Sequence, residues 1–299
     1  MPKRVVLVGH PVIQSLSSAL HQAAFDAKGI DARYEPNDVP LIELPDAIAR
    51  LRGDDYLGAN ITVPYKERVA PMVDRLTEDA QATGAVDTIT REGSRLVGHN
   101  TDVAGFRAAL DALVGRQKMP KAAVIIGAGG GARAAVYAFI TAGFQRVIVF
   151  NRHLHRAEAL VRHFGKTAAH MELRAMTWHE SVIEAELAKT KILINASAVA
   201  DPATTSPINA ELLPPELFVL DLIYWPRDTQ LLRDARAASA TETQNGDTML
   251  LHQTAAAFNL WTGMTIDTDV LRQQLDAARD SGAAPTAPAA VESALASAE

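Results

Sequence analysis

The sequence predicts an α/β protein with two lobes, and three observations lead to that prediction. The chain of 299 residues is long enough for two domains, each with its own core. Short apolar runs typical of buried strands alternate with stretches of helical periodicity, which favours mostly parallel sheets. One such run, 124–126, breaks into glycines, opens an alanine-rich helix and returns as a second buried strand over 146–150, the pattern of a Rossmann-like lobe.

The first lobe is expected to be a mostly parallel α/β arrangement. Gly29 closes its first helix and Pro64 stops its third strand, because glycine adopts left-handed conformations and proline lacks an N–H group. The expected strands are 5–9, 33–36, 56–63 and a hairpin of 86–90 with 95–98, and the expected helices are 19–28, 41–52, 66–75 and 78–83.

A helix over 103–113 and a linker over 115–121 are expected to lead into the Rossmann-like lobe. Two further buried strands follow at 191–197 and 218–224, and an apolar helix over 249–260 could fold back onto the first lobe. The expected lobes, with a cleft between them, are 1–103 completed by 242–280 and then 104–241, followed by an Ala-, Pro- and Ser-rich tail, 281–299, expected to be disordered.

The composition excludes several classes of protein. The net charge of −6 and the dispersed basic residues argue against a nucleic-acid partner or an anionic membrane. The chain has no cysteine, which excludes disulfides and thiolate chemistry, and its histidines lack a matching acidic cluster, so no metal site is expected. No apolar run reaches membrane-spanning length and no signal peptide is evident, so we expect a cytoplasmic monomer or homodimer with a small-molecule substrate.

The glycine-rich turn predicts a dinucleotide site. Glycines let backbone N–H groups at a helix N-terminus approach a pyrophosphate, where the helix dipole favours negative charge. NAD sites usually place Asp or Glu at the end of the second strand to hold the ribose 2′-hydroxyl, but this chain has Asn151 and Arg152 there. A guanidinium can hold a 2′-phosphate, which an acid would repel. The pattern therefore indicates NADP rather than NAD as the cofactor.

Three clusters of polar residues follow predicted strands, where ligands of open α/β sheets bind. They are 9–18, 60–66 and 98–102. Each has a plainer interpretation, since Asp102 or Ser18 could cap a helix and Lys66 could be a solvated first-turn residue. Three strand-end clusters without any ligand are the less plausible alternative, so we interpret them as parts of a substrate site.

Several short motifs occur in a fixed order across both lobes. They are Gly9 to Ser17, Asn60 to Lys66, Gly84-Ala85-Val86, Asn100-Thr101-Asp102 with Gly105, the glycine turn, Asn151-Arg152, Asn195-Ala196-Ser197, Asp221 with Tyr224 and Pro226, and Met249 with Gln253. In the order and spacing of these motifs, nearly the whole chain, from about Val5 to Leu275, resembles the shikimate dehydrogenase family.

The resemblance implies reversible reduction of 3-dehydroshikimate to shikimate by NADPH. It also implies that Lys66 and Asp102 form the pair at the reacting oxygen, where a proton must move as the hydride arrives or leaves. The substrate residues that it implies are Ser15 and Ser17 for the carboxylate, Asn60, Thr62 and Gln253 for ring hydroxyls, Asp87 beside the catalytic lysine, and Tyr224 at the cleft.

The same resemblance assigns the cofactor residues of the second lobe. Met249 is the least specific of them, because a methionine on an apolar helix is more often part of the core. The implied residues are Gly127, Ala128, Gly129, Gly130, Gly131 and Ala132 at the pyrophosphate, Asn151, Arg152 and Arg156 at the 2′-phosphate, and Ser197, Gly246 and Met249 along the rest of the cofactor.

Asp87 is the main departure from the family, which usually has Asn at this position. An amide donates and accepts hydrogen bonds, whereas an ionised carboxylate only accepts. Asp87 would add a negative charge near Lys66 and Asp102, and could hold the Lys66 proton more tightly or favour a substrate with an extra donor such as an amine. Because substrate hydroxyls also donate to carboxylates, a tolerated change is the favoured interpretation.

Two alternative functions stay open. Asp87, together with Gln14 where the family usually has His, is compatible with a related dehydrogenase acting on quinate, aminoshikimate or another hydroxylated ring acid. A non-catalytic sensor that binds NADP is disfavoured because both Lys66 and Asp102 are present.

Overall fold

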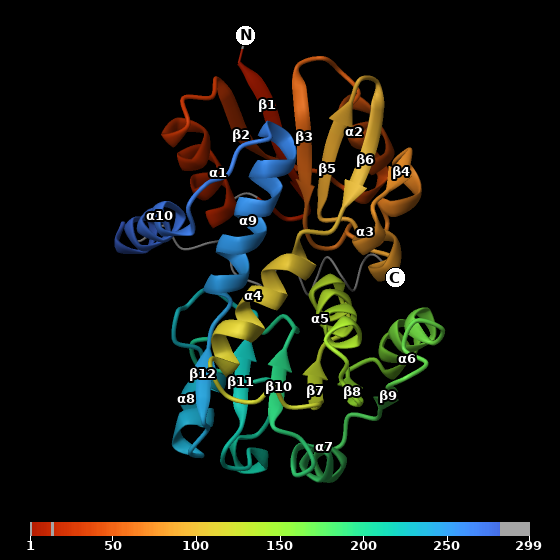
Figure 1. Cartoon of the computed structure of the whole chain (residues 1–299), viewed down its shortest axis with the longest axis vertical. Helices are drawn as coiled ribbons and strands as arrows, with labels where there is room; N and C mark the ends of the chain where they lie inside the picture. The colour runs from red at the N-terminus through yellow and green to blue at the C-terminus, as the bar shows by residue number, and fades with distance from the viewer. Residues whose placement is uncertain (1, 13–14, 282–299) are drawn as a thin grey trace. The chain divides into compact units, whose positions relative to one another are not determined.

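The computed structural model describes residues 2–12 and 15–281, and Figure 1 shows the path of the chain. Gln14 and, apart from Ser281, the tail expected to be disordered lie outside the described residues. The chain divides into two compact units, one made of Met1–Ala104 with Leu250–Glu299 and the other of Gly105–Met249. Each is an α/β unit built around one sheet.

The first unit contains a six-stranded sheet in the order β2-β1-β3-β5-β6-β4. Its strands are β1 (Lys3–Gly9), β2 (Ala32–Asp38), β3 (Tyr56–Ile61), β4 (Arg75–Leu76), β5 (Thr88–Glu92) and β6 (Arg95–His99). β1 pairs in parallel with β2 and β3, and β4 with β6, whereas β5 runs antiparallel to both β3 and β6. The predicted hairpin is therefore confirmed as β5 and β6, joined by Gly93, whose φ is +65°, and Ser94.

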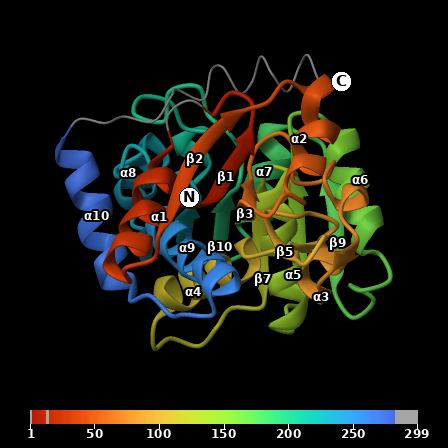
Figure 2. The same ribbon diagram turned by 90° about the horizontal axis from the view of Figure 1, so that it is seen from above.

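Helices cover both faces of this sheet. On one face α2 (Leu44–Arg50) and α3 (Glu78–Thr83) pack against the strands. On the other face Phe25 of α1 (Leu16–Ala27) contacts Phe258 of α9 (Asp247–Thr262), with ring centroids 5.6 Å apart. The indole Nε1 of Trp261 donates to the Ile89 carbonyl at 2.9 Å, so the predicted return of this C-terminal helix to the first lobe is confirmed. A further helix, α10 (Thr268–Asp280), lies alongside α1 (Figure 2).

The prediction of a helix over 66–75 is wrong. This stretch instead consists of turns, the short 3₁₀ helix η2 (Ala70–Met72) and the edge strand β4. Pro71 cannot donate a backbone hydrogen bond, and the carbonyl of Lys66 accepts from the N–H of Val86 at 2.7 Å rather than from a residue one turn later. The segment therefore bonds sideways to the chain that leads into β5.

The second unit contains six parallel strands in the order β12-β11-β10-β7-β8-β9, the doubly wound order of a Rossmann fold. The strands are β7 (Ala122–Ile126), β8 (Arg146–Phe150), β9 (Glu172–Met176), β10 (Ile192–Asn195), β11 (Phe218–Asp221) and β12 (Glu242–Gln244). The four central strands agree with the prediction. The edge strands β9 and β12 were not expected, and because β12 pairs with β11, residues 242–249 belong to this unit rather than to the first lobe.

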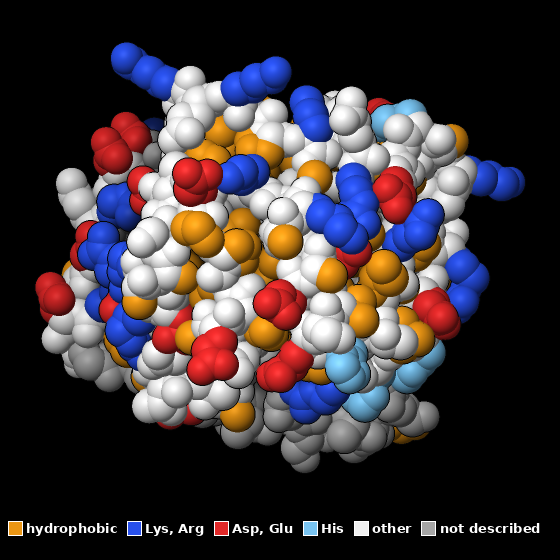
Figure 3. Space-filling view, turned by 90° about the horizontal axis from the view of Figure 1, so that it is seen from below, with side chains coloured by type: hydrophobic (Ala, Val, Ile, Leu, Met, Phe, Trp, Pro, Cys, Tyr) orange, Lys and Arg blue, Asp and Glu red, His pale blue; other side chains and the backbone are white. Residues whose placement is uncertain are grey.

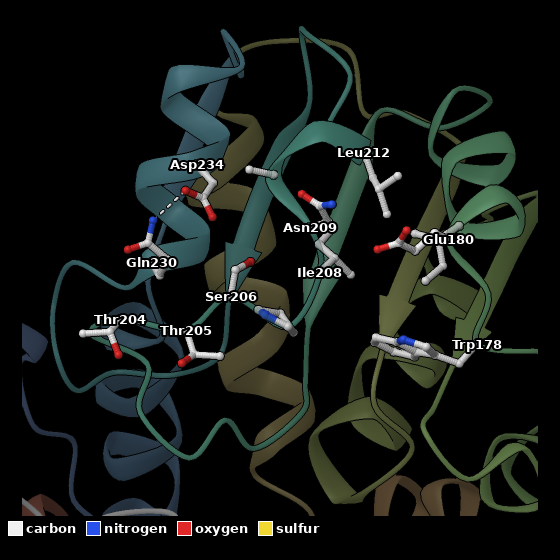
Figure 4. A pocket seen from close by; sticks show the side chains of 13 residues that line it. Trp178, Glu180, Thr204, Thr205, Ser206, Ile208, Asn209, Leu212, Gln230 and Asp234 are labelled. Carbon is white, nitrogen blue, oxygen red and sulfur yellow. Dashed lines mark hydrogen bonds between the residues drawn. The ribbon is translucent and has the colours of Figure 1, made fainter.

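Within the described residues, five helices accompany this sheet: α4 (Asp102–Val114), α5 (Gly130–Thr141), α6 (Leu154–Phe164), α7 (Glu180–Leu187) and α8 (Gln230–Ala237). Of these, α7 and α8 cover the same face. Ile183 and Leu187 of α7 and Leu231 of α8 share one core cluster with the central strands. The connection from β10 to β11 contains only the 3₁₀ helix η3 (Ala210–Leu212), and a hollow of about 530 Å³ lies there beside α7 and α8 (Figure 4). None of the predicted site residues lines this hollow.

The surface of the described residues carries mixed charge. Basic and acidic side chains are interspersed on the face drawn in Figure 3. Within residues 2–12 and 15–281, no helix combines the length and the apolar character needed to cross a membrane.

Gly127 combines a positive φ with a close approach to a neighbouring backbone. Its φ is +109°, and an added Cβ would lie 2.5 Å from the Ala196 carbonyl oxygen. We expect Gly127→Ala to lower the free energy of unfolding by at least about 2 kcal/mol, because both the backbone conformation and this contact oppose a Cβ. Urea unfolding measures the effect.

Gly165→Ala is the matched control for this prediction. Gly165 has a φ of −52°, and the nearest atom to an added Cβ is 3.4 Å away. Its substitution should change stability by no more than about 0.5 kcal/mol. Equal unfolding curves for the two variants would contradict the role assigned to Gly127.

Candidate active site

Lys66 and Asp102 form an ion pair in the first unit, with 2.5 Å between Nζ and Oδ2. Lys66 lies in the turn after β3, and Asp102 is the first residue of α4. The Asp102 side chain is only 2% exposed, whereas that of Lys66 is 18% exposed. An ammonium group that is fixed by a buried carboxylate and still accessible can exchange a proton with a bound oxygen.

Burial raises the pKa of the Asp102 carboxyl, because desolvation disfavours its charged form. The Lys66 ammonium lowers this pKa and the Asp87 carboxylate raises it, and the net direction is upward. The ionised state of Asp102 therefore depends on the positive charge of Lys66.

Asp87 lies just before β5 and is 2% exposed. Its Oδ1 accepts hydrogen bonds from the hydroxyl of Thr88 at 2.7 Å and from both the N–H and the hydroxyl of Thr101, at 2.9 and 2.8 Å. Its Oδ2 accepts from the N–H of Asp102 at 2.6 Å. The carboxylate predicted to bind substrate is thus occupied by four donors of the protein itself.

The Asn60 side chain is also held by protein groups. Its Oδ1 accepts from the Tyr34 hydroxyl at 2.8 Å, and its Nδ2 donates to the Thr88 hydroxyl at 2.9 Å and to the Asp87 carbonyl at 3.1 Å. His21 stacks on Tyr34 with ring centroids 4.5 Å apart, and burial lowers the His21 pKa to about 3, which keeps this imidazole neutral. A hydrogen-bonded chain therefore runs from Tyr34 through Asn60 to the surroundings of Asp102.

The other predicted substrate residues lie on different elements. Ser15 caps α1, its hydroxyl oxygen accepting from the Ser17 N–H at 3.2 Å, so Ser15 has the capping role that was considered for Ser18. Thr62 follows β3, and its methyl group occupies the space that a side chain on Gly9 would need, which places it beside the loop after β1. Gln253 is half-buried on α9 within the first unit, whereas Tyr224 belongs to the second.

The predicted glycine turn connects β7 to α5 in the second unit. Gly127 is required by its close approach to Ala196 and Ser197, and Gly129 is the N-cap of α5. Among the described residues, no side chain caps the start of this helix. Its first N–H groups are consequently available to an anion, which the helix dipole also attracts. The turn holds the remaining predicted pyrophosphate residues: Ala128 and Ala132 are buried, while Gly130 and Gly131 are partly exposed.

The predicted 2′-phosphate residues follow β8. The Asn151 amide donates to the His153 carbonyl at 2.9 Å, which shapes the turn into α6. Arg152 is exposed in this turn, and Arg156 is half-buried in the first turns of α6. The structure therefore brings Asn151, Arg152 and Arg156 to one short segment at the carboxyl end of β8.

In the buried polar network at the ends of β10 and β11, Ser197 was assigned to the cofactor from the sequence, whereas the other members were given no role. Asn195 donates to Asp221 at 2.8 Å and accepts from the Ser197 hydroxyl at 2.6 Å, and Asp221 also accepts from the Thr229 hydroxyl at 2.7 Å. Burial raises the pKa of Asp221 to about 6. The position of polar Asn195 and Asp221 at the ends of apolar strands is the sequence signal that could have indicated this network.

Two further predicted cofactor residues lie at the start of α9: Gly246 directly precedes the helix, and Met249 is in its first turn. Gly246 is buried where a side chain would collide with the Leu222 carbonyl. Met249 is 7% exposed, in keeping with a core position.

Three family models match the chain. Residues 7–89 match the shikimate dehydrogenase substrate binding domain, residues 112–239 match shikimate / quinate 5-dehydrogenase, and residues 248–275 match the shikimate 5'-dehydrogenase C-terminal domain.

Individual relatives span nearly the same length. The NADP(+) shikimate dehydrogenase of Symbiobacterium thermophilum is 37% identical over 275 residues, covering 91% of this chain and 93% of its own. Shikimate 5-dehydrogenase from Thermus thermophilus, solved in complex with NADP(H) and shikimate, has a TM-score of 0.79 at 37% identity, covering 92% of this chain and 99% of its own. Quinate dehydrogenase from Corynebacterium glutamicum, solved with NAD, has a TM-score of 0.81 at 30% identity, covering 92% and 99%.

The ion pair of Lys66 and Asp102 should have a measurable effect on stability. We expect Lys66→Met to lower the free energy of unfolding at pH 7 by roughly 3 kcal/mol, because it leaves a buried carboxylate without its partner. Loss of the lysine raises the native-state pKa of Asp102 further above its unfolded value, so the deficit should shrink as the pH falls and Asp102 becomes protonated. Urea unfolding between pH 5 and pH 8 measures this dependence.

Two controls accompany this measurement. Lys191→Met removes an exposed pair, that of Lys191 with Glu216 at 2.7 Å, and should change stability much less than Lys66→Met does. Adding Asp102→Asn to Lys66→Met should recover part of the loss, since the unpaired charge is gone. A deficit that is the same at every pH would refute the assignment to the Asp102 charge.

Proposed function

The chain belongs to the shikimate dehydrogenase family, and from that premise we propose that it catalyses the reversible NADP-dependent reduction of 3-dehydroshikimate to shikimate. The observation that supports this most directly is the 2.5 Å pair of a partly exposed Lys66 and a buried Asp102. In this proposal the first unit, including the returning residues 250–280, binds the substrate, and the second unit binds NADP.

The chemistry divides between cofactor and protein. NADPH supplies the hydride that reaches the carbonyl carbon, and a proton must then be delivered to the carbonyl oxygen. Lys66 donates this proton in the reduction and accepts it in the reverse reaction. Asp102 orients the ammonium group and stabilises its charge in surroundings where an isolated ammonium would be disfavoured.

The remaining site residues bind and orient the substrate. Ser15 uses its oxygen to cap α1, and its O–H stays available to donate to the substrate carboxylate together with Ser17. Thr62 and Gln253 are proposed to contact ring hydroxyls. Asn60 is proposed to contact a ring hydroxyl as well, while it keeps the hydrogen bonds that protein groups make to both polar atoms of its amide.

The second unit has features that fit NADP. The uncapped start of α5 supplies N–H groups for the pyrophosphate, and Gly127 lets the chain turn there without a side chain. Arg152 and Arg156, with Asn151, are proposed to hold the 2′-phosphate by charge-assisted hydrogen bonds. Ser197 and Gly246 lie on loops after strand ends of the same sheet, where dinucleotides bind in doubly wound folds.

A related activity on quinate is the second candidate. It is supported by the match to the shikimate / quinate 5-dehydrogenase family and by the similarity to a quinate dehydrogenase. An aminated substrate that pairs with Asp87 is less well supported, because four protein donors engage that carboxylate.

Initial rates with shikimate, quinate and aminoshikimate, each with NADP and with NAD, test the proposal. We expect shikimate with NADP to give a kcat/KM at least about tenfold above every other combination, a difference of about 1.4 kcal/mol in transition-state stabilisation. A preference for quinate would establish the second candidate instead. Tight NADP binding without turnover of any of these acids would refute both.

Arg152 should determine the choice of cofactor. We expect Arg152→Gln to raise the KM for NADP by about 10- to 100-fold and to leave the KM for NAD nearly unchanged, because only NADP carries the phosphate that the guanidinium binds. Arg162→Gln is the matched control on the same segment, an exposed arginine of α6 that contacts Glu158 at 4.0 Å. Parallel changes for both cofactors in the Arg152 variant would contradict this role.

A further inference from the structure

We propose that Asp87 is a positioning residue for the Lys66–Asp102 pair: its carboxylate holds the first turn of α4 and thereby fixes Asp102, and it does not bind the substrate. This inference rests on the proposed function, since it concerns a residue of the same site. It assigns a different role to the position at which the family usually has a substrate-binding Asn.

The backbone of Asp87 is fixed between two strands of the sheet. Its N–H donates to the carbonyl of His99 at the end of β6, at 3.1 Å, and its carbonyl accepts from the N–H of Ile61 at the end of β3, at 2.7 Å. The carboxylate therefore cannot turn toward a ligand by a shift of the chain without breaking sheet hydrogen bonds.

The carboxylate itself is buried and is engaged by four donors of the protein. Oδ1 accepts three hydrogen bonds and Oδ2 accepts one at 2.6 Å, and the residue is 2% exposed. A substrate hydroxyl would have to compete with these donors, two of which are backbone N–H groups that have few alternative acceptors at the start of a helix.

An amide would not fit the same donors. If its oxygen replaced Oδ1, its NH₂ group would face the N–H of Asp102, and if it were flipped, the NH₂ group would face the N–H of Thr101. Either orientation opposes two donors and leaves a buried N–H unsatisfied. The surroundings of Asp87 are therefore matched to a carboxylate.

The Asp87 carboxylate accepts hydrogen bonds from the N-terminal end of helix α4. Asp87 accepts from the N–H groups of Thr101 and Asp102, and the side chain of Asn100 accepts from the N–H of Val103 at 3.2 Å. Three consecutive N–H groups of the helix start are thus bonded to side chains. The negative charge of Asp87 also interacts favourably with the helix dipole at this end.

The same short segment holds both partners of the pair. The N–H of Val86 donates to the Lys66 carbonyl at 2.7 Å, and the next residue, Asp87, holds the N–H of Asp102. Residues 86 and 87 therefore connect the backbones of the two residues whose Nζ and Oδ2 atoms lie 2.5 Å apart. Loss of the Asp87 contacts would release Asp102 while Lys66 stays attached to Val86.

Asp87 also acts on Asp102 through its charge. The charged groups that influence Asp102 are Lys66, from the turn after β3, and Asp87, from the chain before β5. Because Asp87 raises the pKa of Asp102, its neutralisation should favour the ionised form of Asp102. This gives the positioning role a signature in the pH dependence that a purely structural role lacks.

The test is Asp87→Asn, assayed with shikimate and NADP. We expect kcat to fall at least about tenfold with a change of less than about threefold in the KM for shikimate, since the interaction lost is with the catalytic pair. The acid limb of kcat/KM should move to lower pH by about half a unit or more, because loss of the Asp87 charge favours the deprotonated form of the Lys66–Asp102 pair, which accepts the proton from shikimate. A raised KM with unchanged kcat and an unmoved acid limb would identify Asp87 as a substrate ligand and overturn the proposal.

Thr101→Val is the matched control. It removes one hydroxyl donor from Asp87 but keeps the carboxylate charge and both backbone N–H contacts. Its acid limb should stay within about 0.2 of a pH unit of that of the parent chain. A shift as large as that of Asp87→Asn would overturn the electrostatic part of the proposal.

A measurement on the unaltered protein covers the case in which Asp87→Asn does not fold. Carbon-13 NMR of the aspartate carboxyls should show a larger change at Asp102 than at Asp87 when shikimate is added. The opposite order would place the substrate on Asp87 and overturn the inference.

Amide hydrogen exchange separates this inference from the proposed function. Asp87→Asn should accelerate exchange at the amides of Thr101 and Asp102, whether or not the protein oxidises shikimate, and unchanged exchange would refute the capping role. Failure of the proposed function appears instead as absent shikimate turnover in the unaltered protein.

Discussion

The buried carboxylate of Asp102 is the constraint around which the first unit is organised, because a charge removed from water needs partners fixed in place. The sheet topology supplies them. β5 runs antiparallel to β3 and β6, so the beginning of β5 lies beside the ends of both neighbours. The chain before β5 therefore meets the turn that carries Lys66 and the segment that enters α4. A fully parallel sheet would not bring one strand's start to the ends of two others.

The predicted cofactor site of the second unit depends on close backbone contacts, whereas the predicted site of the first unit depends on side-chain hydrogen bonds. Two glycines permit close contacts between loops at the strand ends: Gly127 against Ala196, and Gly246 against the Leu222 carbonyl. Side chains would separate these loops, and the start of α5 would no longer be open to an anion. The polar side chains of this region, Asn195 and Asp221, are mostly used to hold the loops to one another.

The sequence predicts the central elements and the identity of the pair better than it predicts the edges and the supporting contacts. The central strands of the second unit are continuous apolar runs, whereas β9 and β12 are short edge strands with polar residues and carry no such signal. The prediction of a helix over 66–75 was wrong because hydrogen bonding to the chain that leads into β5 outweighs the local helix propensity. The role of Asp87 is invisible in the sequence, since two of its four donors are backbone groups that only the fold brings to it.

The return of α9 and α10 to the first unit has a consequence for biogenesis. On a ribosome, residues 1–104 emerge well before Phe258 and Trp261. The side chains of these two residues cover one face of the sheet that residues 1–104 form. At roughly 5–20 residues per second, that face stays exposed for on the order of ten seconds, while the contiguous second unit can already fold. The first unit is therefore the part of the nascent chain that most needs protection by a chaperone, although it begins the sequence.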